Sequence, residues 1–253
     1  MEGLRESLGP LIGLGLTLLL VMLRLEAERF HAAEYDEPVR GRKPSLLRRL
    51  AWYVLGVAGV LALLLVHPSA ERDLYLQVGD RGGILLAFVL GGLGVGQAVA
   101  LALLHYRRLR FPDVAAYPGA LINEILTAFI DEAVFRGAVL GYFMIVTGGE
   151  CNLAILGSAV VYALCTRLGA PGRDKYMLVL ALLIGLVNGW ATLLTGGIGA
   201  AFLGHAITRV AVFLTTGHAG QPPARGTEVE DVEKQRRTPE GWRAVDRTGL
   251  RER

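Results

Sequence analysis

Residues 129–143 read FIDEAVFRGAVLGYF, a stretch that sets three ionisable side chains inside an apolar run. Asp131, Glu132 and Arg136 stand close together in this run. An ionisable group near the centre of a bilayer costs about 2.5 to 3.5 kcal/mol even on lenient insertion scales, so such groups face a bundle interior and have partners. If the run crosses a membrane, these charges mark either a packing contact or a functional site.

The composition favours a membrane protein. Of the 253 residues, 53% are hydrophobic and 19% are charged, and the mean hydropathy is +0.44. The charged residues are clustered beside apolar runs instead of being interspersed as in a soluble domain. The formal net charge of +3 therefore reflects membrane orientation, and because the sequence contains no nucleic-acid motif we expect no nucleic-acid partner.

Seven apolar runs are long enough, or nearly so, to cross a bilayer core, which takes roughly 20 helical residues. The fourth run is so long that it must tilt or begin in the interface near Pro118. The sequence thus predicts an all-α polytopic integral membrane protein with a bundle of about seven transmembrane helices. The predicted spans are 8–25, 51–67, 83–104, 119–147, 152–167, 177–195 and 198–216.

We divide the chain into three parts: three N-terminal helices with their loops (1–117), a core of four helices (118–216) and a polar, flexible tail (217–253). Lys and Arg cluster in alternate loops and in the tail, whereas the opposite loops hold only Arg72 and Arg81. Positive residues near span ends stay in the cytoplasm, so we expect the N-terminus outside and the C-terminus inside a bacterial or archaeal cytoplasmic membrane.

The first span lacks a basic leading segment and a small-residue cleavage site, so we interpret it as a retained anchor and not as a signal peptide. Gly92, Gly96 and Ala100 are spaced four apart, which is typical of close helix packing in lipid. A phosphate-binding loop would need a different glycine spacing and a preceding strand. Cys151 and Cys165 match no metal or redox spacing and should pack as small apolar side chains, without a disulfide.

The charges of the opening stretch have a defined geometry on a helix. Glu132 and Arg136 lie one turn apart, which suits an ion pair, while Asp131 stacks under Glu124 two turns earlier. In the last span, His205 and the residue one turn later, Arg209, are set in apolar surroundings. Two interpretations stay open: buried ion pairs that fix helix packing, or a carboxylate and an imidazole that converge in a cavity and activate water.

Residues 131–143, DEAVFRGAVLGYF, resemble the Glu-Glu-x-x-x-Arg motif of the CPBP (CAAX protease and bacteriocin-processing) family of intramembrane proteases. The usual form of the motif is Glu-Glu-x-x-Phe-Arg-Gly, and Phe135 and Gly137 match it as well. Residues 183–213 are similar to the last two core helices of that family and contain its motif histidine at His205. The resemblance covers roughly residues 118–215 and implies a CPBP-type core.

Three positions depart from the family pattern. The first motif glutamate, the usual activator of water, corresponds to Asp131. The second motif has an aromatic residue, three residues and a histidine, but here Tyr162 is followed by Thr166, whose hydroxyl cannot shuttle a proton near neutral pH. Arg209 replaces an Asn or Asp after the motif histidine. A guanidinium there can donate to an oxyanion, or it can pair with Asp131 and remove its value as a base.

The resemblance implies a hydrolase, an intramembrane endopeptidase that acts on membrane-anchored peptides or proteins presented from the cytoplasmic side. In this prediction Asp131 or Glu132 activates water, His205 and Arg209 stabilise the oxyanion, and Arg136 holds Glu132. The alternative is a catalytically inactive member that binds a membrane protein or lipid; a transporter is disfavoured because no inverted repeat is present. We expect no cofactor and no metal, because too few ligands remain for zinc. The candidate site residues are Asp131, Glu132, Arg136, His205, Arg209 and Thr166.

Overall fold

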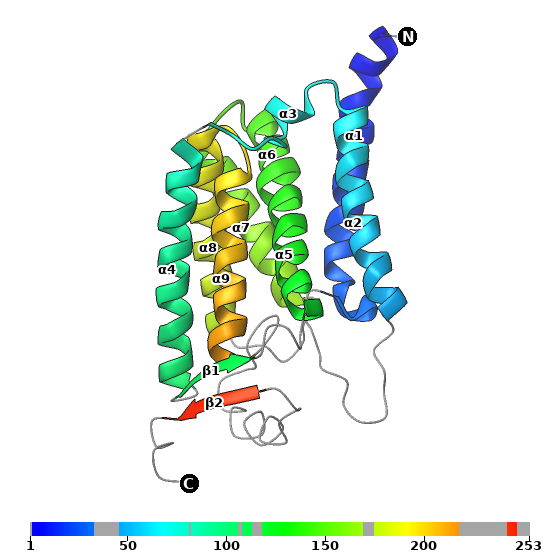
Figure 1. Ribbon diagram of the computed structural model, residues 1–253. Helices are drawn as coiled ribbons and strands as arrows, with labels where there is room; N and C mark the ends of the chain where they lie inside the picture. Colours follow the sequence, from blue (N-terminus) through cyan, green and yellow to red (C-terminus); the bar gives the residue numbers. More distant parts are fainter. Residues whose placement is uncertain are drawn as a thin grey trace.

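The computed structural model describes residues 2–32, 46–80, 82–105, 108–112, 118–168, 175–217 and 242–246. Within these ranges the chain forms a bundle of long, roughly parallel or antiparallel helices (Figure 1). The predicted all-α membrane fold is confirmed.

Each predicted span corresponds to a helical segment. The fourth span is one continuous helical path, α5 (Pro118–Asp131), the π-helical segment η2 (Glu132–Val139) and α6 (Leu140–Val146). Three short elements join the long ones: η1 (Ala27–Phe30), α3 (Ala70–Asp73) and the strand β1 (Arg108–Pro112). The other spans are α1 (Glu2–Leu25), α2 (Leu46–Val66), α4 (Gly82–His105), α7 (Cys151–Leu168), α8 (Lys175–Thr195) and α9 (Gly199–Thr216).

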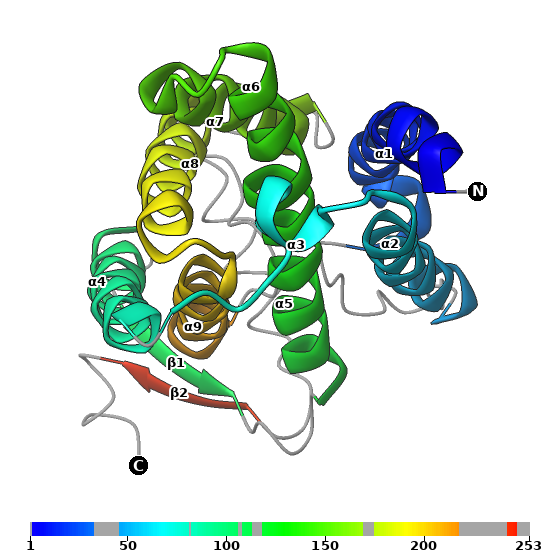
Figure 2. The same ribbon diagram turned by 90° about the horizontal axis from the view of Figure 1, so that it is seen from above.

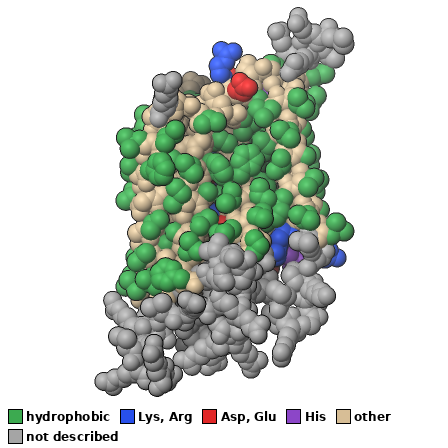
Figure 3. Space-filling view, in the orientation of Figure 1, with side chains coloured by type: hydrophobic (Ala, Val, Ile, Leu, Met, Phe, Trp, Pro, Cys, Tyr) green, Lys and Arg blue, Asp and Glu red, His purple; other side chains and the backbone are tan. Residues whose placement is uncertain are grey.

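The outer surface of the bundle is apolar along most of its height. Five helices in the described residues are long and apolar enough to cross a membrane, and the helix Cys151–Thr166 is shorter but also apolar. Large apolar side chains point outward, among them Leu65 at 74% exposure and Leu104 at 80%. Figure 3 shows this hydrophobic belt, with charged side chains mainly towards the two ends. Such a surface suits lipid, because a soluble protein rarely exposes a contiguous apolar patch of this extent.

Helix α9 occupies a central place in the bundle. It packs along α4 and also contacts α5 and α8 (Figure 2). The pair formed by α1 and α2 lies on the other side of α5, where α1 contacts η2 and α7. The segment α5–η2 is therefore enclosed from two sides, which buries its charged residues.

The glycines that pack against a neighbouring helix differ from those predicted. A Cβ at Gly91 would press on Ile207, and one at Gly94 would overlap Thr208. The absence of a side chain at both positions therefore allows α9 to pack closely against α4. Gly92 and Gly96 have open space where a Cβ would be, and Ala100 is exposed. The predicted packing face at Gly92, Gly96 and Ala100 is therefore wrong: the glycines that contact α9, Gly91 and Gly94, are three residues apart and lie on a different face of the same helix.

A short antiparallel sheet was not predicted. Strand β1 pairs with β2 (Trp242–Asp246), with Arg108 opposite Asp246 and Pro112 opposite Trp242. The rest of the tail, for which we predicted flexibility, and the polar loop 33–45 lie outside the described residues.

Both cysteines are free. Cys165 is buried, as expected for a small apolar side chain, whereas Cys151 is exposed at the start of α7. The expectation of apolar packing is therefore confirmed for Cys165 and wrong for Cys151.

Candidate active site

Glu132 is the residue on which the buried polar contacts converge. Its Oε1 lies 2.6 Å from Nδ1 of His205 on α9 and accepts a hydrogen bond of 3.0 Å from Nδ2 of Asn188 on α8. Its Oε2 lies 3.3 Å from Nε of Arg136. The Glu132 side chain is 0% exposed. Three elements thus meet at one carboxylate that is out of contact with solvent.

The π-helical segment η2 begins at Glu132 and carries the motif residues. π-Helical turns are rare and are frequently found at functional sites, because the wider turn redirects the side chains that it carries. The predicted ion pair between Glu132 and Arg136 is confirmed. The guanidinium of Arg136 also lies 3.9 Å above the ring centroid of Tyr162, a cation–π contact that helps to accommodate a fully buried arginine.

Asp131 turns away from Glu132 and towards helix α1. Its Oδ1 lies 2.6 Å from Nε of Arg24, and both side chains are buried. The predicted alternative in which Asp131 pairs with Arg209 is therefore wrong. Nothing in the local sequence links Arg24 to a residue more than a hundred positions away, so the sequence did not predict this pair.

Arg209 pairs with a different carboxylate. Its Nε lies 2.9 Å from Oε2 of Glu124, and Nδ2 of Asn123 donates to the other oxygen of Glu124 at 2.8 Å. The hydroxyl of Tyr53 on α2 donates in turn to Oδ1 of Asn123. Glu124 and Asp131 belong to the same helix but have partners on opposite sides of it, α9 and α1. The shared helix face expected from their spacing therefore does not give the two carboxylates a common partner.

Thr166 does not reach this cluster with its hydroxyl. The hydroxyl donates to the carbonyl oxygens of Tyr162 and Ala163 in its own helix, both at 3.0 Å. The aromatic residue of the same motif does take part, because the Tyr162 ring lies edge-on to His205 with the ring centroids 6.4 Å apart. This part of the chain therefore supplies an aromatic wall but no second histidine.

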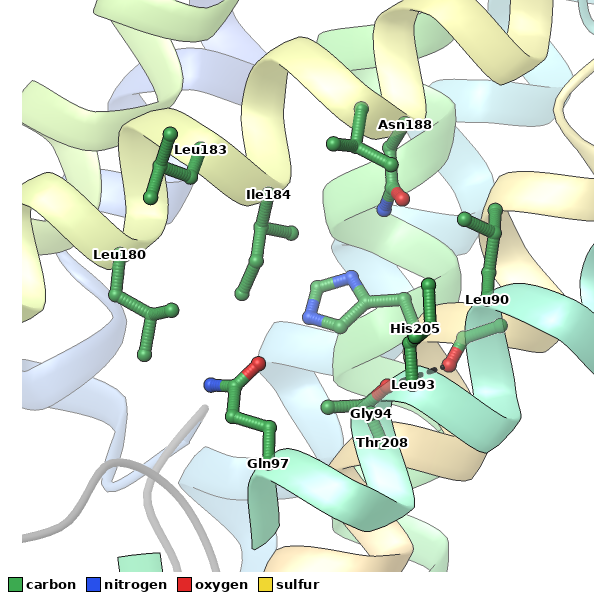
Figure 4. Close-up of a pocket in the computed structure, with 12 residues that line it drawn as sticks. Leu90, Leu93, Gly94, Gln97, Leu180, Leu183, Ile184, Asn188, His205 and Thr208 are labelled. Carbon is green, nitrogen blue, oxygen red and sulfur yellow. Dashed lines mark hydrogen bonds between the residues drawn. The ribbon is translucent and has the colours of Figure 1, made fainter. Parts of the chain in front are cut away.

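A cavity of about 230 Å³ opens beside His205, between α4, α8 and α9. Most of its wall is leucine, isoleucine and valine, but the side chains of Gln97, Asn188, His205 and Thr208 also line it. Figure 4 shows the imidazole of His205 and the carboxamides of Gln97 and Asn188 directed into the same space. Because Nδ1 of His205 is occupied by Glu132, Nε2 is the nitrogen that can act in the cavity.

Gln97 and Asn188 were missed by reasoning from the sequence. Each was visible there as a single amide in a strongly apolar run, Gln97 in GVGQAVA (94–100) and Asn188 in LIGLVNGW (183–190). Polar residues in transmembrane helices usually face the bundle interior or a cavity, so this signal could have identified both.

A family model described as type II CAAX prenyl endopeptidase, Rce1-like, matches residues 113–211. This segment is a CPBP-family domain. The match confirms the predicted resemblance and its extent. No curated protein and no solved structure matches the chain.

The CPBP segment contains α5, η2, α6, α7, α8 and α9 as far as residue 211, and hence Glu132, Asn188 and His205. At the family level, this segment is similar to membrane-embedded endopeptidases. Two side chains of the assembled site come from outside the segment: Arg24 from α1 and Gln97 from α4. Helix α4 therefore lines the cavity through Gln97, whereas α1 contacts the segment through the packing pair of Arg24 and Asp131.

Proposed function

We propose that this protein is an intramembrane endopeptidase in which the Glu132–His205 pair activates the attacking water. The observation that carries the proposal is the 2.6 Å contact between Glu132 Oε1 and His205 Nδ1, with the imidazole at the wall of a cavity. A carboxylate that accepts a hydrogen bond from Nδ1–H of an imidazole selects the tautomer in which Nε2 is unprotonated and can act as a base. The substrates are membrane-anchored peptides or proteins.

In the proposed reaction, Nε2 of His205 takes a proton from water as the water oxygen attacks the peptide carbonyl. The imidazolium is stabilised by Glu132, as a carboxylate stabilises the histidine of a protease triad. The imidazolium then returns the proton to the leaving amine when the carbon–nitrogen bond breaks. Asn188 donates one amide hydrogen to Glu132, and its second hydrogen is a candidate donor to the oxyanion.

This assignment changes the roles inferred from the sequence for four residues. His205 becomes the base, with Glu132 orienting it, whereas Asp131 serves helix packing through Arg24. Arg209 likewise holds α9 to α5 through Glu124. The proposed reaction is written without a metal, because a carboxylate and an imidazole together can activate water.

A noncatalytic function is the second candidate, favoured by a specific observation. The buried carboxylates Glu124, Asp131 and Glu132 each have an arginine partner. Buried ion pairs of this kind serve packing and registry as readily as chemistry. In this alternative the protein keeps the CPBP fold and binds a membrane protein or lipid without cleaving it.

The deciding experiment measures cleavage of a membrane-proteome substrate pool, with farnesylated and unmodified peptides included, by the purified protein in nanodiscs. We expect the wild type to cleave, and we expect Glu132→Gln and His205→Ala to lose at least about 100-fold in rate, as is typical when a general base is removed. Gly96→Ala, which faces open space on α4, is the matched control and should retain full activity.

Thermal unfolding of every variant separates a lost reaction from a lost fold. If the wild type releases no fragment beyond an empty-nanodisc control, the endopeptidase proposal fails and the noncatalytic alternative stands. If only the farnesylated peptides are cleaved, the substrate class is the one that the family description names.

A further inference from the structure

Gln97 is the one polar side chain of α4 between Gly82 and Leu104. It is partly buried and lines the cavity beside His205 and Asn188. Figure 4 draws no hydrogen bond between its carboxamide and the other lining residues. A buried amide in an apolar helix is costly unless a partner or water satisfies it, so the Gln97 carboxamide at the cavity is available to hydrogen-bond a ligand there.

Helix α4 holds this residue in a fixed place. Gly91 and Gly94 allow α4 to approach α9 closely, against Ile207 and Thr208. Gln97 follows one turn after Gly94, and His205 precedes Thr208 by one turn on α9. The close α4–α9 contact therefore keeps the carboxamide and the imidazole on the same cavity, whereas α4 and α8 touch at few positions and leave the space between them.

The polar groups of the cavity match a peptide backbone. A carboxamide carries a carbonyl acceptor and N–H donors, the same complement as a peptide group. The cavity offers two carboxamides in a wall that is otherwise mainly leucine, isoleucine and valine. A peptide that is helical satisfies its own backbone, but an unwound stretch in a membrane needs such partners. The apolar wall suits apolar side chains on that stretch.

We infer that the cavity between α4 and α8 binds an unwound, apolar stretch of a membrane-anchored peptide, and that Gln97 positions it by hydrogen bonds to its backbone. The inference rests on the proposed function in that its ligand is the peptide substrate. It adds that recognition depends on backbone amides and apolar side chains and that α4, outside the family segment, supplies a positioning residue.

The test measures binding separately from cleavage. All samples carry Glu132→Gln to stop turnover, and the probe is a fluorescent Leu/Ala peptide of roughly 20 residues with two central glycines that favour unwinding. Gln97→Met keeps the length of the side chain but removes the amide, and Gly96→Ala is the control on the open face of α4. Each central backbone amide of the peptide is replaced in turn by an ester, which deletes one N–H.

We expect Gln97→Met to weaken peptide binding about three- to tenfold, the usual effect of one or two net hydrogen bonds, while Gly96→Ala binds like its parent. One ester position should weaken binding to the protein with Gln97 and leave binding to the Q97M protein unchanged. In the protein with an intact Glu132, Q97M should raise KM and change kcat less than twofold, a split that general damage to the fold would not produce.

Equal binding by Q97M and its parent, or an ester effect that is the same in both, would overturn the inference. A photoreactive amino acid placed at position 183, in the cavity wall, gives a second test. Crosslinking of phospholipid and not of the peptide would also overturn the inference. If the wild type cleaves but Q97M binds normally, the inference fails and the proposed function survives. If Q97M loses binding but no protein cleaves, the peptide site stands and the endopeptidase proposal fails.

Discussion

The three buried carboxylates Glu124, Asp131 and Glu132 have different partners, so we expect their substitutions to have different effects. Glu132 contacts Arg136 and the two cavity-lining residues His205 and Asn188. Asp131 and Glu124 are paired with Arg24 and Arg209 and bind neighbouring helices to α5. Both charges of a buried ion pair have lost their contact with water. Replacing one partner therefore destabilises the fold strongly, because it leaves the other charge buried and unpaired, whereas replacing both partners costs little.

This division predicts the behaviour of Asp131. Asp131→Asn leaves Arg24 buried without its counter-charge, and we expect a loss of about 3 to 5 kcal/mol in the free energy of unfolding. Adding Arg24→Met should recover most of that loss, because both charges are then gone. Thermal and denaturant unfolding in detergent measure the three variants. Strictly additive losses would show that the two side chains act independently.

The same variants separate packing from chemistry. If Asp131 only packs, the double variant R24M/D131N should retain cleavage at the wild-type rate per folded molecule. Lost cleavage in a folded double variant would return Asp131 to the role of water activator that the family resemblance assigned to it.

At the scale of elements, the contact between α4 and α9 decides whether the cavity exists. A Cβ at Gly94 would overlap Thr208, whereas one at Gly96 would meet nothing nearby. We expect Gly94→Ala to destabilise the protein by about 1 to 3 kcal/mol through overpacking, and Gly96→Ala to be neutral or slightly stabilising because alanine favours helix. Limited proteolysis and thermal unfolding compare them. Equal effects of the two substitutions would contradict the described α4–α9 face.

At the scale of the whole molecule, the exposed Cys151 tests the predicted orientation. It follows the turn between α6 and α7, which our topology places outside the cell, while Cys165 is buried. A membrane-impermeant maleimide added to intact spheroplasts should therefore label the wild type. Cys151→Ser, the control, should remain unlabelled. Labelling that appears only after the membrane is broken would invert the topology.

The sequence by itself determined the elements of the fold and the local part of the site. Apolar runs of membrane-spanning length predicted each long helix closely, because spanning helices satisfy their backbone internally and depend little on distant residues. The Glu132–Arg136 pair followed from helical spacing in the same way. The family motif was equally readable, since it consists of neighbours in the chain.

Only the tertiary structure decided which residues pair across helices and which line the cavity. Arg24 with Asp131, Arg209 with Glu124, and Gln97 with Asn188 at one cavity join residues from different helices. In each helix the period fixes which side chains share a face, but not which neighbour that face meets. The close approach at Gly91 and Gly94, and not at Gly92 and Gly96, sets that choice for α4. Steric fit between helices, which no local pattern encodes, thus determines the cavity and its chemistry.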